Sequence, residues 1–147
     1  MEFDGHKTLE ISMHQSYTYL TDPSVLVRSM PGLKSLIETE PGVYRADMEW
    51  GVAPLKVKYH GSIRIVDANP PKSYRMIMEG QGPKGNVGIN LAVALTALNS
   101  ESTDVHFQGK TESDDDSGGL GQRVMSGVAQ MVVNQFFSAL VKEAKSR

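Results

Sequence analysis

Alternation of apolar and polar residues over much of residues 33–113 is the feature that most limits the fold of this chain. The clearest case is LKVKYHGSIRIV at 55–66, in which most odd-numbered residues are apolar and most even-numbered residues are polar. The apolar residues at odd positions are Leu55, Val57, Tyr59, Ile63 and Ile65. Because successive side chains of a strand point to opposite faces of a sheet, this pattern predicts a strand with one buried face.

Similar runs recur along the chain and are separated by turn-forming residues. They lie at 43–50, 73–80, 86–98 and 103–113, between the turn segments EPG, GVAP, ANPP, GQGPKG and NSES. Residues 3–13 predict one more strand at the front. Residues 14–32 predict two short helices, broken at Asp22-Pro23 and ended at Pro31-Gly32. The order predicts an α+β fold, with an antiparallel sheet of about six or seven strands.

The segment RVMSGVAQMVVNQFFSALV at 123–141 predicts a long C-terminal helix with one apolar side. At helical spacing, the apolar stripe consists of Met125, Val128, Ala129, Val132, Phe136, Ala139 and Leu140. Acidic residues at 114–116 and basic residues near the end suit the helix dipole and place the helix at about 117–145. Side-chain amides, serines and Arg123 within the stretch argue against a transmembrane span.

A curved sheet with one apolar face requires a cover, and this stripe is the longest apolar surface available. We therefore expect a single domain over residues 1–147, in which the sheet wraps around the helix and leaves an apolar cavity. The expected cavity lining is Met48, Trp50, Leu55, Val57, Tyr59, Met76, Met78, Ile89, Leu91, Val93, Phe107, Met125, Val128, Val132 and Phe136. A densely filled interior is the alternative, and the sequence does not decide between the two.

Two further apolar residues of the helix, Phe137 and Val141, fall on the side that the stripe assigns to solvent. They are four residues apart and therefore adjacent on a helix surface. We interpret this pair as a docking spot for a partner protein or a membrane surface.

Composition excludes several classes of protein. The 15 Lys and Arg residues are scattered and the net charge is −2, which argues against a nucleic-acid-binding protein. The absence of cysteine excludes disulfides and thiolate chemistry. The N-terminus MEFDGHKTLE lacks the features of a secretory signal, so a cytoplasmic location is expected.

No motif points clearly to a metal or phosphate site. The histidines, at positions 6, 14, 60 and 106, show no metal-binding spacing, so no metal site is expected. The stretch GQGPKGNVG lacks the GK[ST] ending of a phosphate loop and predicts a hairpin turn. The run SDDDSGG is not an EF-hand loop and predicts the start of a helix.

The sequence predicts no catalytic set. Asp47, Glu49, Arg75 and Glu79 have the strand parity that points to solvent. The inward polar candidates are Tyr44, Tyr59 and Tyr74, and a buried tyrosine is more often a core aromatic than a catalytic acid.

Five segments carry a family resemblance along nearly the whole chain. In order they are FDG, YLTDPSVLVRSMPGLKSL, YHGSIRIVDANPP, YRMIMEGQGPKG and GGLGQRVMSGVAQMVVNQFF. Together they resemble the CoxG family of carbon monoxide dehydrogenase subunits. This family is part of the helix-grip (SRPBCC) superfamily, which includes START domains, pollen allergens and polyketide cyclases. The resemblance implies an accessory protein of molybdenum-dependent CO dehydrogenases or related hydroxylases, with roles in membrane recruitment and in carrying a quinone.

Two functional hypotheses follow. The first is a non-enzymatic binding protein that holds a quinone or another lipid, has no covalent cofactor, and contacts the inner face of the cell membrane peripherally. The second is a small enzyme of cyclase, hydratase or hydrolase type, because the same fold supports catalysis elsewhere.

Overall fold

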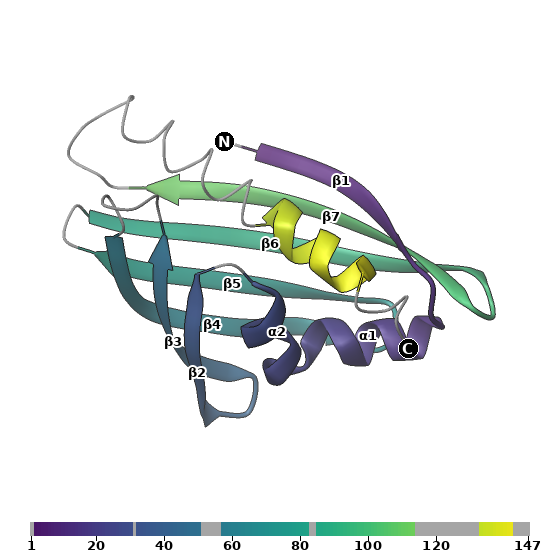
Figure 1. Ribbon diagram of the computed structural model, residues 1–147, viewed down its shortest axis with the longest axis horizontal. Helices are drawn as coiled ribbons and strands as arrows, with labels where there is room; N and C mark the ends of the chain where they lie inside the picture. The colour runs from purple at the N-terminus through teal and green to yellow at the C-terminus, as the bar shows by residue number, and fades with distance from the viewer. Residues whose placement is uncertain (1, 31, 51–56, 83–84, 114–132, 143–147) are drawn as a thin grey trace.

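The computed structural model describes residues 2–30, 32–50, 57–82, 85–113 and 133–142. In chain order, the labelled elements of Figure 1 are β1 (Glu2–Leu9), α1 (Met13–Thr21), α2 (Pro23–Ser29), β2 (Leu33–Glu40), β3 (Val43–Trp50), β4 (Val57–Asn69), β5 (Ser73–Gly82), β6 (Gly85–Asn99) and β7 (Ser102–Ser113). A further helix covers residues 133–142.

The strands form one seven-stranded antiparallel sheet in the order β1-β7-β6-β5-β4-β3-β2. Strands β2 to β7 are each paired with their neighbours in the sequence, whereas β1 pairs with β7. Helices α1 and α2 therefore connect the two edge strands of the sheet. The predicted α+β fold is confirmed, with seven strands.

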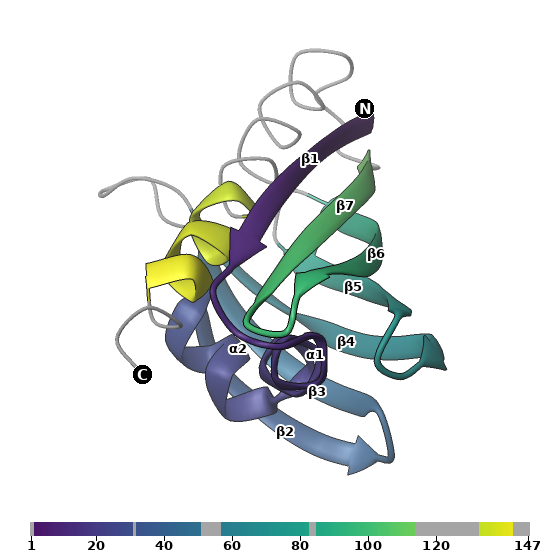
Figure 2. The same ribbon diagram turned by 90° about the vertical axis from the view of Figure 1, so that its right-hand side faces the viewer.

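The sheet is strongly curved, and the helices lie on its concave side (Figures 1 and 2). The break between the two short helices lies at Asp22, as predicted, because this residue ends α1 and caps α2. Its carboxylate accepts a hydrogen bond from the backbone N–H of Ser24 at 2.9 Å, and the side-chain and backbone bonds from Ser24 lower its pKa. Pro23 occupies the first turn of α2, where a missing N–H costs nothing.

Close packing at glycine permits the curvature. Gly61 of β4 lies opposite Gly80 of β5, and a methyl group added at Gly61 would collide with the backbone carbonyl of Glu79. At the other side of the sheet, a methyl group on Gly109 of β7 would collide with the Phe3 ring of β1. Glycine at these two positions therefore lets neighbouring parts of the chain approach closely.

The described part of the C-terminal helix presents one apolar side to the core. Val133, Phe136, Phe137 and Leu140 are buried, at the i, i+3, i+4 and i+7 positions of one helix face. Residues 134, 135 and 138 are polar and exposed. In Figure 1 this helix, in yellow, crosses the concave side of the sheet.

The prediction that Phe137 is part of an outer docking pair is wrong. Its side chain is 0% exposed and stacks on Phe107 of β7, with ring centroids 4.4 Å apart and planes 9° from parallel. Val141 is half-buried and packs against the same core. The predicted stripe omitted Val133 and assigned Phe137 to solvent, so the buried face is rotated relative to the prediction.

The substitution Phe137→Ala should destabilise the protein by about 3–5 kcal/mol, because it removes a fully buried ring and its stacking contact with Phe107. Urea unfolding followed by circular dichroism measures this change. Ser138→Ala, on the exposed side of the same helix, should change stability by less than about 0.5 kcal/mol. A loss below about 1 kcal/mol for Phe137→Ala would show that the ring is not packed.

Gly61→Ala should destabilise the protein by at least about 1–3 kcal/mol, because the added methyl group overlaps the Glu79 carbonyl. The matched control is Gly88→Ala in β6, where the added methyl group would lie 3.6 Å from the Met78 carbonyl oxygen, an ordinary contact. Thermal melts of the two variants should therefore differ clearly. Equal melting temperatures would contradict the close approach at Gly61.

Candidate ligand-binding interior

The concave face of the sheet is lined by apolar side chains that the strand register places side by side. Met78 of β5 lies between Ile63 of β4 and Ile89 of β6. Met76 pairs with Leu91. Because the sheet is antiparallel and in register here, these side chains form continuous rows across the concave face.

The structure brings most of the predicted cavity residues together. Nine of them are buried in one apolar cluster: Met48, Tyr59, Met76, Met78, Ile89, Leu91, Val93, Phe107 and Phe136. Trp50 and Val57 are paired across β3 and β4, but their side chains lie outside the described part of the structure. Leu55, Met125, Val128 and Val132 lie outside the described residues altogether. That these residues line a cavity stays a prediction.

One row of the concave face carries very small side chains. Ala46 of β3 lies opposite Gly61 of β4, which in turn lies opposite Gly80 of β5. Ala46 is fully buried. Side-chain volume on the concave face is therefore lowest along this row, between the row of Met48 and Tyr59 and the row of Ile63 and Met78.

Tyr74, expected from the sequence only as an inward tyrosine, has a special position in the structure. Its side chain is 2% exposed, and among the described residues no partner hydrogen-bonds to its hydroxyl. The ring of Tyr17 from α1 meets it edge-on, with centroids 5.6 Å apart. Burial raises the pKa of Tyr74 far above the ordinary value of 10.0. A buried hydroxyl without a partner costs about 1–3 kcal/mol, so this group is of interest as a polar anchor.

The charged side chains that could have served catalysis lie on the convex face and have partners there. Asp47 accepts from the Ser35 hydroxyl at 2.9 Å and lies 2.8 Å from His60 Nδ1, and these two contacts lower its pKa. Arg75 donates to Asn90 at 2.9 Å. These contacts confirm the predicted outward direction of Asp47 and Arg75.

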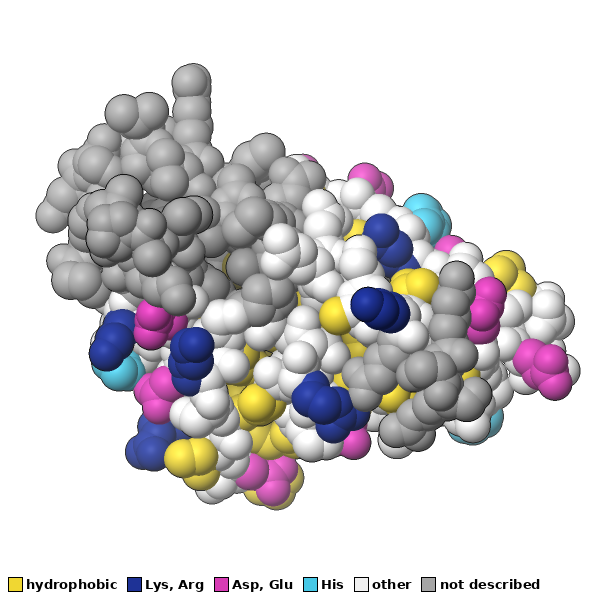
Figure 3. All heavy atoms as spheres, in the orientation of Figure 1, with side chains coloured by type: hydrophobic (Ala, Val, Ile, Leu, Met, Phe, Trp, Pro, Cys, Tyr) yellow, Lys and Arg dark blue, Asp and Glu magenta, His cyan; other side chains and the backbone are white. Residues whose placement is uncertain are grey.

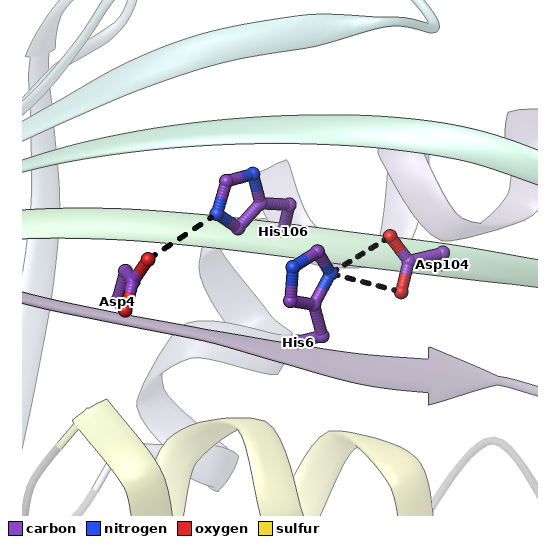
Figure 4. A network of polar contacts seen from close by, with 4 residues as sticks. All are labelled: Asp4, His6, Asp104 and His106. Carbon is purple, nitrogen blue, oxygen red and sulfur yellow. Dashed lines mark hydrogen bonds and ion pairs between the residues drawn. The ribbon is translucent and has the colours of Figure 1, made fainter.

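Two of the histidines come together on the convex face (Figure 4). The rings of His6 and His106 stack with centroids 4.2 Å apart. His6 Nδ1 lies 3.1 Å from an Asp104 oxygen, and His106 Nε2 lies 3.8 Å from an Asp4 oxygen. Among the described residues, no group of three or more His, Cys, Asp or Glu side chains is arranged to hold a metal ion.

Three surface hollows are formed by described residues. A cleft of about 880 Å³ separates the start of α1 from the β6–β7 turn, and its lining includes Glu10, His14 and Glu101. Two smaller hollows, of about 240 and 620 Å³, lie on the convex face around Ala92. The predicted cavity lining shares only Val93 with these three hollows.

On the face shown in Figure 3, basic and acidic side chains are interspersed over the described residues. Within the described ranges, none of the helices is long and apolar enough to cross a membrane.

A curved antiparallel sheet closed by a C-terminal helix over an apolar concave face defines the START-like, helix-grip class of proteins. Solved structures of this class share the fold with this chain. A START superfamily protein from Mycobacterium smegmatis has a TM-score of 0.76 and 12% identity, and the alignment covers 99% of this chain and 97% of that one. The Zhui aromatase/cyclase from Streptomyces sp. R1128 has a TM-score of 0.74 and 13% identity, over 100% and 94% of the two chains.

Within this class, the chain belongs to the CoxG family of carbon monoxide dehydrogenase subunits, whose sequence model matches residues 5–145. A conserved protein from Geobacillus kaustophilus is 30% identical with a TM-score of 0.88, over 99% of this chain and 96% of that chain. No curated protein matches the sequence. Family and fold together indicate a ligand-binding accessory role.

The substitution Tyr74→Phe in ligand-free protein should leave stability at neutral pH unchanged or raise it, because it removes an unpaired buried hydroxyl. Above pH 10 the difference should grow. The unfolded tyrosine ionises there while the buried one stays protonated, so the wild type alone loses up to about 1.4 kcal/mol per pH unit through this group.

Urea unfolding at pH 8, 10 and 11 checks both expectations. Below the pKa of tyrosine in the unfolded chain, Tyr74 is protonated in both states and its contribution to the free energy of unfolding does not change with pH. Because its pKa is raised in the folded state, stability is lost only above that pH. A destabilised variant at pH 8 would show that the Tyr74 hydroxyl has a partner within the protein. The same pH dependence for both proteins would show that this hydroxyl ionises in the folded state and is therefore not buried.

Proposed function

We propose that this protein is a non-enzymatic accessory protein that binds an isoprenoid quinone in its interior. In this role it supplies an electron acceptor to a molybdenum-type carbon monoxide dehydrogenase or a related hydroxylase. The observation that carries the proposal is the methionine-containing apolar face formed by Met48, Met76 and Met78 on the concave side of the sheet. Family membership supports the partner.

The chemistry of the concave face suits an isoprenoid chain. Pockets for apolar ligands are lined mostly by hydrophobic and aromatic side chains with few polar groups. Methionine is unbranched and flexible, so Met76 and Met78 can adapt to a methyl-branched chain of irregular outline. Ala46 is a small side chain of this face, so a larger residue at this position would compete with a ligand.

The proposed partner follows from the family, which is named for a subunit of carbon monoxide dehydrogenase. A quinone dissolves in the membrane, whereas a molybdenum hydroxylase releases its electrons at a protein site. A carrier that shields the isoprenoid chain from water connects the two. We therefore propose a cytoplasmic protein that contacts the inner face of the cell membrane peripherally while it loads or unloads its ligand.

A small enzyme of cyclase, hydratase or hydrolase type is the second candidate, favoured by the fold shared with the Zhui aromatase/cyclase. Such an enzyme needs an acid or base on the concave face, and Tyr59, which is 4% exposed there, is the residue to test. Turnover of a polyketide-like substrate that disappears in Tyr59→Phe would favour the enzyme over the carrier.

Wild-type protein purified from its host and extracted with organic solvent should release an isoprenoid quinone, detected by mass spectrometry. Ala46→Phe should reduce the bound quinone severalfold, because the ring fills the lowest row of the concave face. Ala92→Phe is the matched control, since Ala92 pairs with Gln108 on the convex face, and it should retain the ligand.

Two results would contradict the carrier. One is the absence of extractable lipid together with no binding of added menaquinone by the wild type. The other is a filled core, in which Ala46→Phe costs about 1–3 kcal/mol in the urea unfolding of ligand-free protein and no variant alters binding.

A further inference from the structure

Tyr74 lies at one end of the inward-facing residues of β5. Tyr74 is the first inward residue of β5, followed on the same face by Met76 and Met78. Its cross-strand partner Val93 and the next pair, Met76 and Leu91, are uncharged. Away from Tyr74 along β5, the concave face is therefore apolar.

Helix α1 covers the same end of the interior. Tyr17 of α1 touches the Tyr74 ring edge-on, and α1 packs against β6 and β7. The neighbouring Ser16 is 0% exposed, and no described residue hydrogen-bonds to its hydroxyl oxygen. Two buried hydroxyls that have no hydrogen-bond partner among the described residues thus belong to α1 and to the strand that α1 contacts.

The hydroxyl of Tyr74 can serve only as a neutral group. Burial raises its pKa above the usual range, so the hydroxyl keeps its proton at neutral pH. A protonated phenol buried among apolar side chains is a hydrogen-bond donor that requires an acceptor. A neutral carbonyl oxygen fits this need, whereas a carboxylate would lose its hydration beside Val93, Met76 and Leu91 without a compensating charge.

We propose that Tyr74 donates a hydrogen bond to a carbonyl oxygen of the bound ligand, which fixes the ligand's head under α1 and its chain along Met76 and Met78. This inference rests on the proposed function and adds the orientation of the ligand and the functional group that is recognised. Tyr74, which would bind the head group, lies on β5. Met76 and Met78, which would contact the isoprenoid chain, follow it on the same strand.

The test compares two probes that differ in their oxygen atoms. A short-chain menaquinone has carbonyl oxygens, and squalene is an isoprenoid hydrocarbon without oxygen. Both compete with a pyrene-labelled alkane for the ligand-free protein. Tyr74→Phe should weaken menaquinone binding by about 2- to 10-fold, the effect of one hydrogen bond, and should leave squalene binding unchanged.

Tyr44→Phe is the matched control. Tyr44 is also a buried tyrosine of the concave face, but its hydroxyl already bonds to Glu38. The variant should bind both probes as the wild type does. Infrared spectra of menaquinone with ¹³C-labelled carbonyls give an independent signal: the carbonyl stretch should lie at lower frequency in the wild type than in Tyr74→Phe, because the hydrogen bond weakens the C=O bond.

The outcomes separate this inference from the proposed function. If Tyr74→Phe weakens both probes equally, or neither, while the wild type binds both, the carbonyl contact is refuted and the carrier stands. An unchanged carbonyl frequency refutes the contact as well. If the wild type binds neither probe, the proposed function and this inference are both overturned.

Discussion

Burial of the concave face of the sheet is the constraint on which the rest of the structure depends. A seven-stranded sheet with one apolar face is stable in water only if that face is covered. Curvature brings the covering helices within reach, and the close approach at Gly61 permits that curvature. The stacked rings of Phe107 and Phe137 then fix the C-terminal helix to β7, far away in the sequence. The curvature of the sheet and the position of the C-terminal helix therefore both serve to keep the apolar concave face away from water.

The same constraint separates the chemistry of the two faces. Ionisable groups of the central strands, such as Asp47 and Arg75, point outward and form local contacts with His60 and Asn90. The concave face retains apolar side chains and a few tyrosines, of which Tyr74 has no described hydrogen-bond partner. An interior of this kind is suited to the apolar ligand that we propose. Membership of the CoxG family is consistent with an accessory role.

The sequence predicted the sheet well because parity is a local property. In β3 and β5, every second side chain had to be apolar for one face to be buried, and Met48, Met76 and Met78 lie where parity placed them. The buried face of the C-terminal helix was harder to predict. A helix does not alternate strictly between two faces, and several apolar stripes fit the same segment. The choice of stripe decided whether Phe137 faced the core, and that choice depends on the ring of Phe107, which is distant in sequence. That no described residue hydrogen-bonds to the Tyr74 hydroxyl was equally beyond prediction, since hydrogen-bond partners are set by the folded structure.

The central claim is that the concave face binds an isoprenoid ligand, and contacts with its methionines test it most directly. Protein labelled with ¹³C at the methionine methyl groups and mixed with unlabelled menaquinone can be studied by isotope-filtered NMR. We predict nuclear Overhauser effects from the methyl groups of Met76 and Met78 to the isoprenoid chain, because both side chains lie buried on the concave face. Bound ligand with contacts only to surface residues, such as those of the cleft beside α1, would contradict the account.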